Sequence, residues 1–257
     1  MSRISCIIIT RDEATNIRRC LESVRWADEI VVVDSGSTDD TKRIASEFTD
    51  RIFDLKWEGF GPTKEFARTQ TREEWILSVD ADEVVSEKLK EEIKRTVGSP
   101  EPADGYLIPR RSNFLGRWMG HGGWYPDLVL RLFRKDGGRF TLSTVHEEVR
   151  VRGRIGRLKN DLLHHTDPDF HHYLAKLNRY TSLDAARLFD AGGKSTLRDM
   201  TLRPLVAFVK MYLVKAGFLD GIHGLILALA SAFHVFSKYV KLWHLGKSRG
   251  RARDTDI

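Results

Sequence analysis

The chain has 257 residues, of which 41% are apolar and 30% charged, a balance typical of a globular protein. This composition excludes a disordered chain, and 20 Gly with 7 Pro excludes a collagen-like one. The net charge of +6 lies in residues 198–257, which hold ten Lys or Arg and four Asp, so a uniformly basic nucleic-acid-binding domain is excluded. Two cysteines, Cys6 and Cys20, cannot form a disulfide framework, which favours a reducing compartment.

The first part of the sequence alternates strands with helices. Continuous apolar runs predict strands over Ile4–Thr10, Glu29–Asp34 and Trp75–Val79, with a shorter strand over Arg51–Leu55. Helical spacing and capping residues predict helices over Arg11–Val24, Thr41–Phe48, Lys64–Thr71 and Ser86–Val97. This order predicts an α/β fold with a mostly parallel central sheet, helices on both faces and ligands at the carboxyl ends of the strands.

The pattern changes after Gly105. Short strands and turns up to about His165 predict an antiparallel extension of the sheet. Helical spacing then predicts helices over Phe170–Phe189, Thr201–Leu219 and Ile222–Leu245. We therefore expect an α/β domain over residues 1–195, C-terminal helices over 196–246 and a basic mobile tail over 247–257.

Polar residues follow three of the predicted strands. These segments are Thr10-Arg11-Asp12-Glu13, Asp34-Ser35-Gly36-Ser37 and Asp80-Ala81-Asp82. Because the carboxyl ends of parallel strands meet at one edge of a sheet, the three segments should converge. The carboxylates of Asp80 and Asp82 can hold a divalent metal that bridges a nucleotide diphosphate. The alternative is a helix-capping loop with solvated acids.

Three segments resemble the nucleotide-sugar half of family 2 glycosyltransferases: SCIIITRDEATNIRRCLESV, WADEIVVVDSGSTDDT and WILSVDADE. Three more, GGWYPDLVLRLFRK, VHEEV and LLHHTDPDFHHYLAKLNRYT, resemble its bacterial lipopolysaccharide-core glucosyltransferase branch, and the likeness extends to about Trp243. The resemblance implies a GT-A-type nucleotide-sugar fold over residues 1–195. It also implies an inverting transfer of a hexose, with glucose expected, from a UDP-sugar to a lipopolysaccharide core or another glycolipid.

The resemblance implies roles for individual residues. The nucleoside is expected to contact Thr10, Asp12 or Glu13, and Asp34, which would accept a hydrogen bond from the uracil ring. Asp80 would face the ribose or the sugar, while Asp82 and His164 would hold Mn²⁺ or Mg²⁺. Arg131 lies in a segment expected to approach this site, where a guanidinium group can hold phosphate in two-point contact. The alternative for Arg131 is the solvated face of a strand.

An inverting transfer needs one base, which takes the proton from the acceptor hydroxyl as that oxygen attacks the anomeric carbon. The family's carboxylate matches the segment Val145-His146-Glu147-Glu148. Glu147 is the expected base, and Glu148 stays open because many relatives have Glu-Asp here. Asp127 is a competing base whose alternative role is to cap a turn. The segment Gly120–Trp124 resembles the glycine-containing loop under donor and acceptor.

The C-terminal helices combine apolar residues with cations. The longest uncharged run, Gly221–Ser237, has 17 residues, whereas a spanning helix needs about 20. An apolar helix flanked by Lys, Arg, Trp and Tyr favours the surface of an anionic bilayer. We therefore expect peripheral association with the cytoplasmic face of the bacterial inner membrane and a lipid-linked acceptor. The alternative is a helix hairpin packed on the domain or on a second subunit.

Two other functions remain open. The segment Asp80-Ala81-Asp82-Glu83-Val84 matches the motif of aspartyl-phosphate phosphohydrolases, with Asp80 as the nucleophile. That class carries the motif on its first strand, whereas two strand–helix units precede it here. The third alternative is a non-catalytic, membrane-bound scaffold that kept the nucleotide-sugar fold.

Overall fold

The structure is a computed structural model that describes residues 2–142, 148–167 and 169–254. Its internal contacts divide the chain into two compact units. The first unit comprises Met1–Arg111 with Pro126–His165, and the second comprises Ser112–Tyr125 with Thr166–Ile257. The domain boundaries expected from the sequence, at residues 195 and 246, stay predictions.

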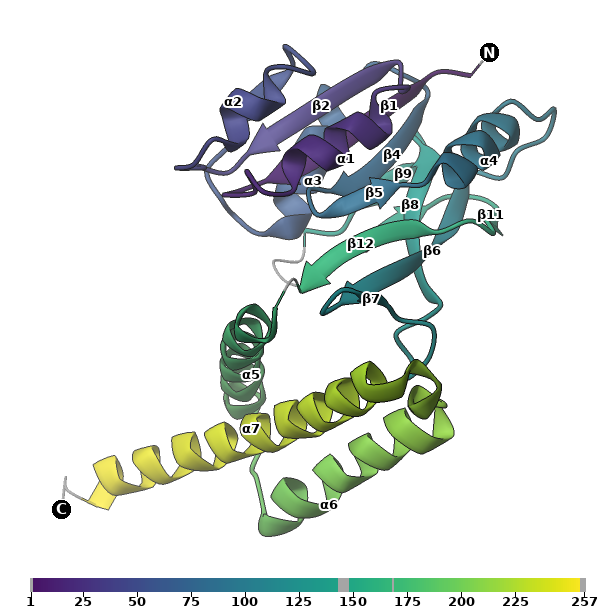
Figure 1. The fold of residues 1–257 in the computed structure, drawn as a ribbon. Helices are drawn as coiled ribbons and strands as arrows, with labels where there is room; N and C mark the ends of the chain where they lie inside the picture. The colour runs from purple at the N-terminus through teal and green to yellow at the C-terminus, as the bar shows by residue number, and fades with distance from the viewer. Residues whose placement is uncertain (1, 143–147, 168, 255–257) are drawn as a thin grey trace. The chain divides into compact units, whose positions relative to one another are not determined.

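The first unit is built on the predicted parallel strands. These strands are β1 (Ile4–Thr10), β2 (Glu29–Asp34), β3 (Ile52–Asp54) and β4 (Trp75–Asp80). They lie side by side in the order β3-β2-β1-β4, and every neighbouring pair is parallel. The parallel half of the predicted sheet is therefore confirmed (Figure 1).

The sheet continues beyond β4 with mainly antiparallel neighbours. They are β5 (Glu83–Val85), β6 (Gly105–Phe114), β8 (Asp127–Arg134) and β12 (Leu162–Asp167). The pairs β4–β8, β6–β8 and β5–β12 are antiparallel, which confirms the predicted extension. The short strand β11 (Ile155–Arg157) departs from this prediction because it pairs parallel with β6. Before it, β9 (Gly138–Phe140) and β10 (Val149–Val151) form a separate two-stranded sheet.

The helices of the first unit are α1 (Ile17–Val24), α2 (Thr41–Ala45), α3 (Phe60–Gln70) and α4 (Glu87–Val97). The prediction for α1 was wrong at its start: the backbone of Asp12 is left-handed (φ 54°), so the chain after β1 is a loop. Ser86 caps α4 as predicted and accepts a hydrogen bond from the backbone N–H of Leu89. Helix α3 begins before the predicted Lys64, with Pro62 in its first turn.

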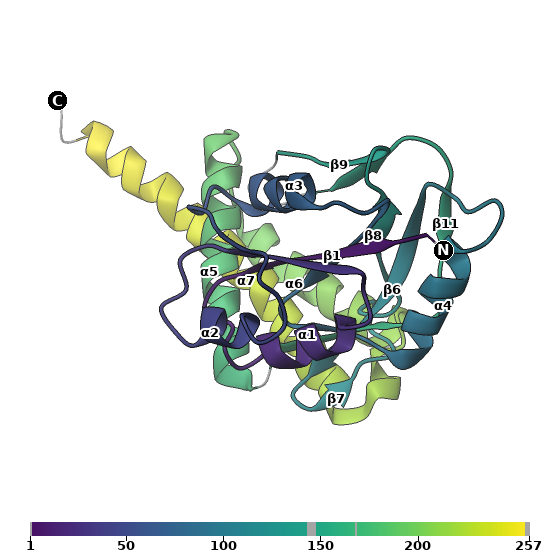
Figure 2. The same ribbon diagram turned by 90° about the horizontal axis from the view of Figure 1, so that it is seen from above.

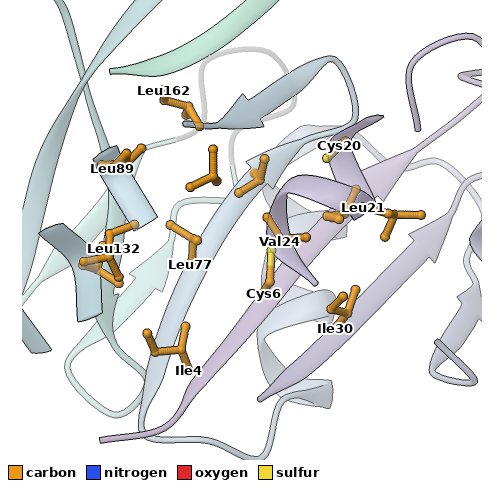
Figure 3. Packing of buried hydrophobic residues seen from close by; sticks show 14 of the residues in the cluster. Ile4, Cys6, Cys20, Leu21, Val24, Ile30, Leu77, Leu89, Leu132 and Leu162 are labelled. Carbon is orange, nitrogen blue, oxygen red and sulfur yellow. The ribbon is translucent and has the colours of Figure 1, made fainter. Parts of the chain in front are cut away.

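Alternate residues of the central strands pack on opposite faces of the sheet. On one face, Cys6 and Ile8 belong to a buried cluster that includes Leu21 of α1 and Leu89 of α4. Figure 3 shows this packing from close by. On the other face, residues such as Ile7 pack against α3. Figure 2 shows α1 and α3 on the two sides of β1, so both faces of the sheet are covered.

The second unit is mainly helical. Its long helices are α5 (Phe170–Asp190), α6 (Leu197–Val209) and α7 (Gly221–Asp254). The predicted helix over Thr201–Leu219 is interrupted: α6 passes into a π-helical turn, Lys210–Val214, and the backbone of Ala216 is left-handed. A 3₁₀ turn, Gly217–Asp220, then leads into α7, which lies alongside α6 (Figure 1).

Helix α7 is longer than the sequence predicts. It extends through Asp254, well into the segment 247–257 that we expected to be a tail. Among the described residues, Gly217–Ser248 is the one segment long and apolar enough to cross a membrane by length and composition alone. The Lys241 side chain ties α7 to α5, donating to the backbone oxygen of Asn178 and to the hydroxyls of Thr181 and Ser182.

Candidate active site

The carboxyl ends of β1, β2 and β4 meet at one edge of the sheet. In the strand register Thr10 is paired with Asp34, and Ile9 is paired with Asp80. Three of the residues predicted to bind the donor therefore lie on adjacent strand ends. The convergence expected from the parallel strand order is confirmed.

The loops after β1 and β2 bind each other through short polar side chains. The Asp12 carboxylate accepts a hydrogen bond from the backbone N–H of Thr38 at 2.7 Å, and its own N–H donates to Ser37 Oγ at 2.9 Å. The N–H of Glu13 donates to Thr41 Oγ1 at 2.8 Å. Asp12 and Glu13 are predicted to contact the nucleoside, and these hydrogen bonds also fix the conformation of the loop after β1 that carries them.

Asp34 holds the turn that follows β2. Its Oδ1 accepts the backbone N–H groups of Gly36 and Ser37, at 3.0 and 2.9 Å, and its Oδ2 accepts the Ser37 hydroxyl. The side chain is buried. Since an ionised carboxylate has about four acceptor positions, these three hydrogen bonds leave capacity for one more donor.

Two hydroxyl groups at this edge are buried without a hydrogen-bond partner among the described residues. They are Thr10 Oγ1 and Ser35 Oγ, at the carboxyl ends of β1 and β2. The backbone N–H of Ser35 donates to the carbonyl oxygen of Thr10, so the two residues are neighbours. Buried hydroxyls in native proteins are normally satisfied, and this pair is suited to a polar ligand bound at the edge. Sequence reasoning singled out Thr10 but did not single out Ser35.

Asp80 lies among cations. Lys64 Nζ is 2.9 Å from its Oδ1, and the Arg131 guanidinium contacts both of its oxygens. Burial acts to raise the pKa of Asp80, but the charges of Arg131 and Lys64 outweigh it and hold that pKa well below its usual range. Asp80 is therefore an ionised carboxylate at neutral pH. Arg131, predicted to bind the nucleotide-sugar, is itself buried in this contact.

Glu83 extends the same network and was missed at the sequence level. Its Oε1 lies 3.0 Å from Arg131 Nη2 and 3.3 Å from Arg110 Nη1. Its Oε2 accepts the backbone N–H of Asp80 at 2.9 Å. Arg110 in turn donates to Asp127, at 2.9 and 2.6 Å. A continuous chain of ion pairs thus joins Asp80 to Asp127.

Lys64 was also missed, because sequence reasoning used it only to mark the start of a helix. It is 2% exposed, on the side of α3 that also buries Ala67 and Arg68. A lysine within an otherwise buried helix face requires a carboxylate partner. A lysine at an apolar helix position is therefore the sequence signal that could have predicted an ion pair between Lys64 and an acid at a strand end, such as Asp80.

Asp82 and His164 form a separate pair. The distance from Asp82 Oδ2 to His164 Nε2 is 3.2 Å, and the backbone N–H of His165 donates to the Asp82 carbonyl. Both side chains keep some exposure, 24% for Asp82 and 15% for His164. Within the described ranges, no cluster of three or more His, Cys, Asp or Glu is placed to hold a metal. One carboxylate oxygen and one imidazole nitrogen fit a divalent ion whose further ligands are diphosphate oxygens.

The candidate bases differ in what the structure says of them. Glu147 lies outside the described residues. Glu148 is exposed; its carbonyl oxygen accepts the backbone N–H of Thr141, and its own N–H donates to Thr141 Oγ1. Asp127, the competing base, forms an ion pair with Arg110; its role as a base stays a prediction.

The loop resembling the glycine-containing segment, Gly120–Trp124, lies in the second unit. Asp220 accepts the backbone N–H groups of Gly120 and His121 and lies 3.2 Å from His121 Nδ1. The N–H of Gly122 donates to the carbonyl oxygen of Lys215 at 2.9 Å. The α6–α7 connection therefore holds this loop in place.

Comparison with known proteins identifies sequence relatives over nearly the whole chain. The profile of Glycosyl transferase family 2 matches residues 5–152. The chain is 28% identical to the lipopolysaccharide core biosynthesis glycosyltransferase LpsC of Rhizobium meliloti, over 98% of this chain and 96% of that protein. It is 30% identical to an uncharacterized glycosyltransferase of Rickettsia felis, over 94% and 90% of the two chains.

Solved structures share the fold. The mannosyltransferase PcManGT of Pyrobaculum calidifontis, in complex with GDP-Man and Mn²⁺, has a TM-score of 0.53 at 15% identity and covers 94% of this chain and 87% of its own. S. aureus TarS 1-349 in complex with UDP-GlcNAc has a TM-score of 0.50 at 17% identity, over 97% and 92%. These similarities confirm the expected GT-A-type fold.

Proposed function

Because this chain belongs to glycosyl transferase family 2, we propose that it transfers a hexose, with glucose expected, from a UDP-sugar to a lipopolysaccharide core or another glycolipid. The chain is a glycosyltransferase; the donor, the acceptor and the inverting outcome are the proposal. The observation that carries it is the alignment of Thr10, Asp34 and Asp80 at one sheet edge, followed by Asp82. The fold and the family make a phosphohydrolase built on Asp80 the poorer explanation of the same residues.

The nucleoside of the donor is proposed to bind across the ends of β1 and β2. The unsatisfied hydroxyls of Thr10 and Ser35 and the remaining acceptor position of Asp34 offer it hydrogen bonds. The loops carrying Asp12 and Glu13 are preorganised by the contacts described above. Binding would therefore require little ordering of these loops, which favours affinity.

The diphosphate is proposed to lie near Asp82 and His164, which would hold Mn²⁺ or Mg²⁺. A divalent ion supplies charge neutralisation for the diphosphate as it leaves. Asp80, kept ionised by Lys64 and Arg131, would accept hydrogen bonds from hydroxyls of the ribose or of the sugar. In this proposal Arg131 acts mainly by orienting Asp80, and its direct contact with the donor stays a prediction.

The base is proposed to be Glu147, with Glu148 as the alternative. The base must lie within hydrogen-bond distance of the acceptor hydroxyl, and it receives that proton as the C–O bond to the anomeric carbon forms. Asp127 ranks behind both, because two N–H groups of Arg110 already occupy one of its oxygens. A proton on Asp127 would weaken that ion pair.

The protein is proposed to work at the cytoplasmic face of the inner membrane as a peripheral protein. A lipid-linked acceptor would be presented there. Although Gly217–Ser248 passes a length and composition test for a spanning helix, Lys241 within it makes four contacts of 2.7–2.8 Å with polar groups of α5. Those contacts favour a helix that packs on protein over one that crosses lipid.

Calorimetric titration with UDP, ADP and GDP in the presence of Mn²⁺ tests the donor site. We expect selective UDP binding, which Asp82→Ala should weaken by about 10- to 100-fold or more, as should removal of Mn²⁺. The matched control is Asp50→Ala, an exposed acid in the pocket lined by Arg3 and Arg51, away from Asp82. This control should bind UDP like the unchanged protein.

Each other outcome has a definite meaning. Tight binding of ADP or GDP would support a glycosyltransferase that uses a different nucleotide-sugar as its donor. Absence of nucleotide binding by folded protein would overturn the proposed donor site. UDP binding without transfer from any UDP-sugar to core saccharides would favour the non-catalytic scaffold.

A further inference from the structure

The connection between α6 and α7 exposes apolar side chains. Five of them lie within ten residues and are between 48% and 72% exposed. They are Leu213, Val214, Phe218, Leu219 and Ile222. We call this group the apolar tip. Soluble monomers rarely leave such a group uncovered, so the apolar tip indicates a surface that another phase or molecule covers.

The apolar surface continues from the tip along both helices. On α6 the exposed apolar residues recur at helical spacing, and on α7 they do the same. They are Leu202, Leu205, Val206 and Val209 on α6, and Leu229, Phe233 and Phe236 on α7. Each helix therefore buries only part of its apolar residues against its neighbours.

The charges around the apolar tip have one sign. Lys210 and Lys215 are exposed within or beside it, and Lys247 is exposed farther along α7. Arg203 on α6 does not add to this charge, because it is paired with Asp199 at 2.6 Å. Between Met200 and Arg253 the sequence contains a single acid, Asp220. A surface that combines apolar side chains with cations is complementary to an anionic bilayer.

Asp220 does not oppose such a surface, because it is 3% exposed and turned to protein donors. Its carboxylate is held by the N–H groups of Gly120 and His121 and by the imidazole of His121. The acid is thereby withdrawn from the outer surface. The same contacts attach the loop Gly120–Trp124 to the base of the apolar tip.

We propose that the apolar tip and its flanking lysines dock on the surface of an anionic bilayer, and that Asp220 keeps the loop Gly120–Trp124 fixed to the docked segment. This docking proposal rests on the proposed function for the lipid-linked acceptor, and it adds which residues contact the lipid. A second copy of this chain is the competing occupant. Charge disfavours it, because pairing two such surfaces would bring like charges together.

Co-sedimentation of the full chain with vesicles tests the docking surface. Vesicles of phosphatidylcholine with phosphatidylglycerol are compared with vesicles of phosphatidylcholine alone. We expect binding to the anionic vesicles. The triple variant Phe218→Ser, Leu219→Ser, Ile222→Ser should lower the partition coefficient on the order of 100-fold, because three half-exposed apolar side chains no longer enter the lipid.

Two further variants separate the contributions. Lys210→Gln with Lys215→Gln should lower the partition by about 25-fold and reduce its dependence on salt. The matched control Ile155→Ser changes an equally exposed apolar residue of β11 in the other unit and should bind vesicles normally. All variants are checked for unchanged melting temperature and UDP affinity, so that loss of vesicle binding cannot be attributed to misfolding.

The proposal is overturned if the triple variant binds anionic vesicles as well as the unchanged protein. It is also overturned if the apolar tip instead mediates a dimer, seen by sedimentation velocity and abolished by the triple variant. If the unchanged protein binds vesicles but no UDP, the donor proposal fails and the docking surface stands. If it binds UDP but no vesicles, only the docking surface fails.

Discussion

Glu83 connects the two halves of the buried ion network, and the variant Glu83→Gln tests how far the fold depends on it. The Glu83 side chain is fully buried. One of its oxygens faces Arg110 and Arg131, and the other accepts the backbone N–H of Asp80. Glutamine keeps the shape of the side chain but replaces one oxygen with an NH₂ group. That group must then face either the Asp80 N–H or the two guanidinium groups.

The loss of stability follows from these contacts. Leaving one buried neutral donor unpaired costs about 1–3 kcal/mol, and removing one member of a buried ion pair costs about 3–5 kcal/mol. Arg131 keeps Asp80 and Arg110 keeps Asp127 in the variant, so we expect the lower end of the ion-pair range, about 3 kcal/mol. For a chain of this size that corresponds to a melting temperature lower by roughly 6–12 °C.

Thermal unfolding at neutral pH, followed by circular dichroism, measures this difference. Glu87→Gln is the matched control, because the Glu87 side chain is 81% exposed and, among the residues that the structure describes, its ion pair is with Lys90 on the surface of α4. It should lower the melting temperature by no more than about 3 °C. A Glu83→Gln protein that melts within about 2 °C of the unchanged chain would refute the view that this network stabilises the fold.

Three further predictions concern single groups. Since the pKa of Asp80 is held below its usual value, its charge stabilises the fold fully above about pH 4. The difference in free energy of unfolding between the unchanged protein and Asp80→Asn should therefore shrink as pH falls below that value. Urea titrations that show a constant difference would contradict this. Burial raises the pKa of both Cys6 and Cys20, so neither thiol of the native protein should react with iodoacetamide at about pH 8. Mass spectrometry of the treated protein checks this, and rapid alkylation would show that the β1–α1 core opens. Asp220→Asn should speed amide hydrogen exchange at the backbone of Gly120 and His121, because an amide group cannot accept all the hydrogen bonds that the carboxylate accepts. Unchanged exchange would mean that Asp220 does not hold the loop Gly120–Trp124 in place.

The parallel strands could be predicted because their sequence signal is local. A strand buried on both faces is a continuous apolar run, and the bounds of β1 and β2 agree with the runs that predicted them. The three-residue strand β5 has no such signal, since it forms by pairing with Leu162–His164, far along the chain. The predicted start of α1 was wrong for a similar reason. Asp12 contacts the loop after β2, and the residues before Ile17 therefore form a loop instead of the first turns of the helix.

The candidate site divides in the same way. Placing Asp80 and Asp82 at the edge shared with Asp34 required only the order of strands and helices. The partners of Asp80 could not be found this way, because Lys64 comes from a helix and Arg131 from an antiparallel strand added later in the chain. Tertiary packing, which no local pattern records, decides which charges meet.

The different surroundings of Asp80 and Asp82 indicate how the two carboxylates share the work. Asp80 is already paired with Lys64 and Arg131, so its charge is largely neutralised and it attracts a divalent cation less than an unpaired carboxylate would. Asp82 has no lysine or arginine within ion-pair distance in the described part of the chain, and its near partner is His164, whose side chain is of a common metal-binding type. This contrast supports the proposed position of the metal at Asp82 and His164 and the proposed role of Asp80 in binding hydroxyl groups. A D-x-D sequence by itself treats the two acids as equivalent; the cations supplied by α3 and β8 make them different.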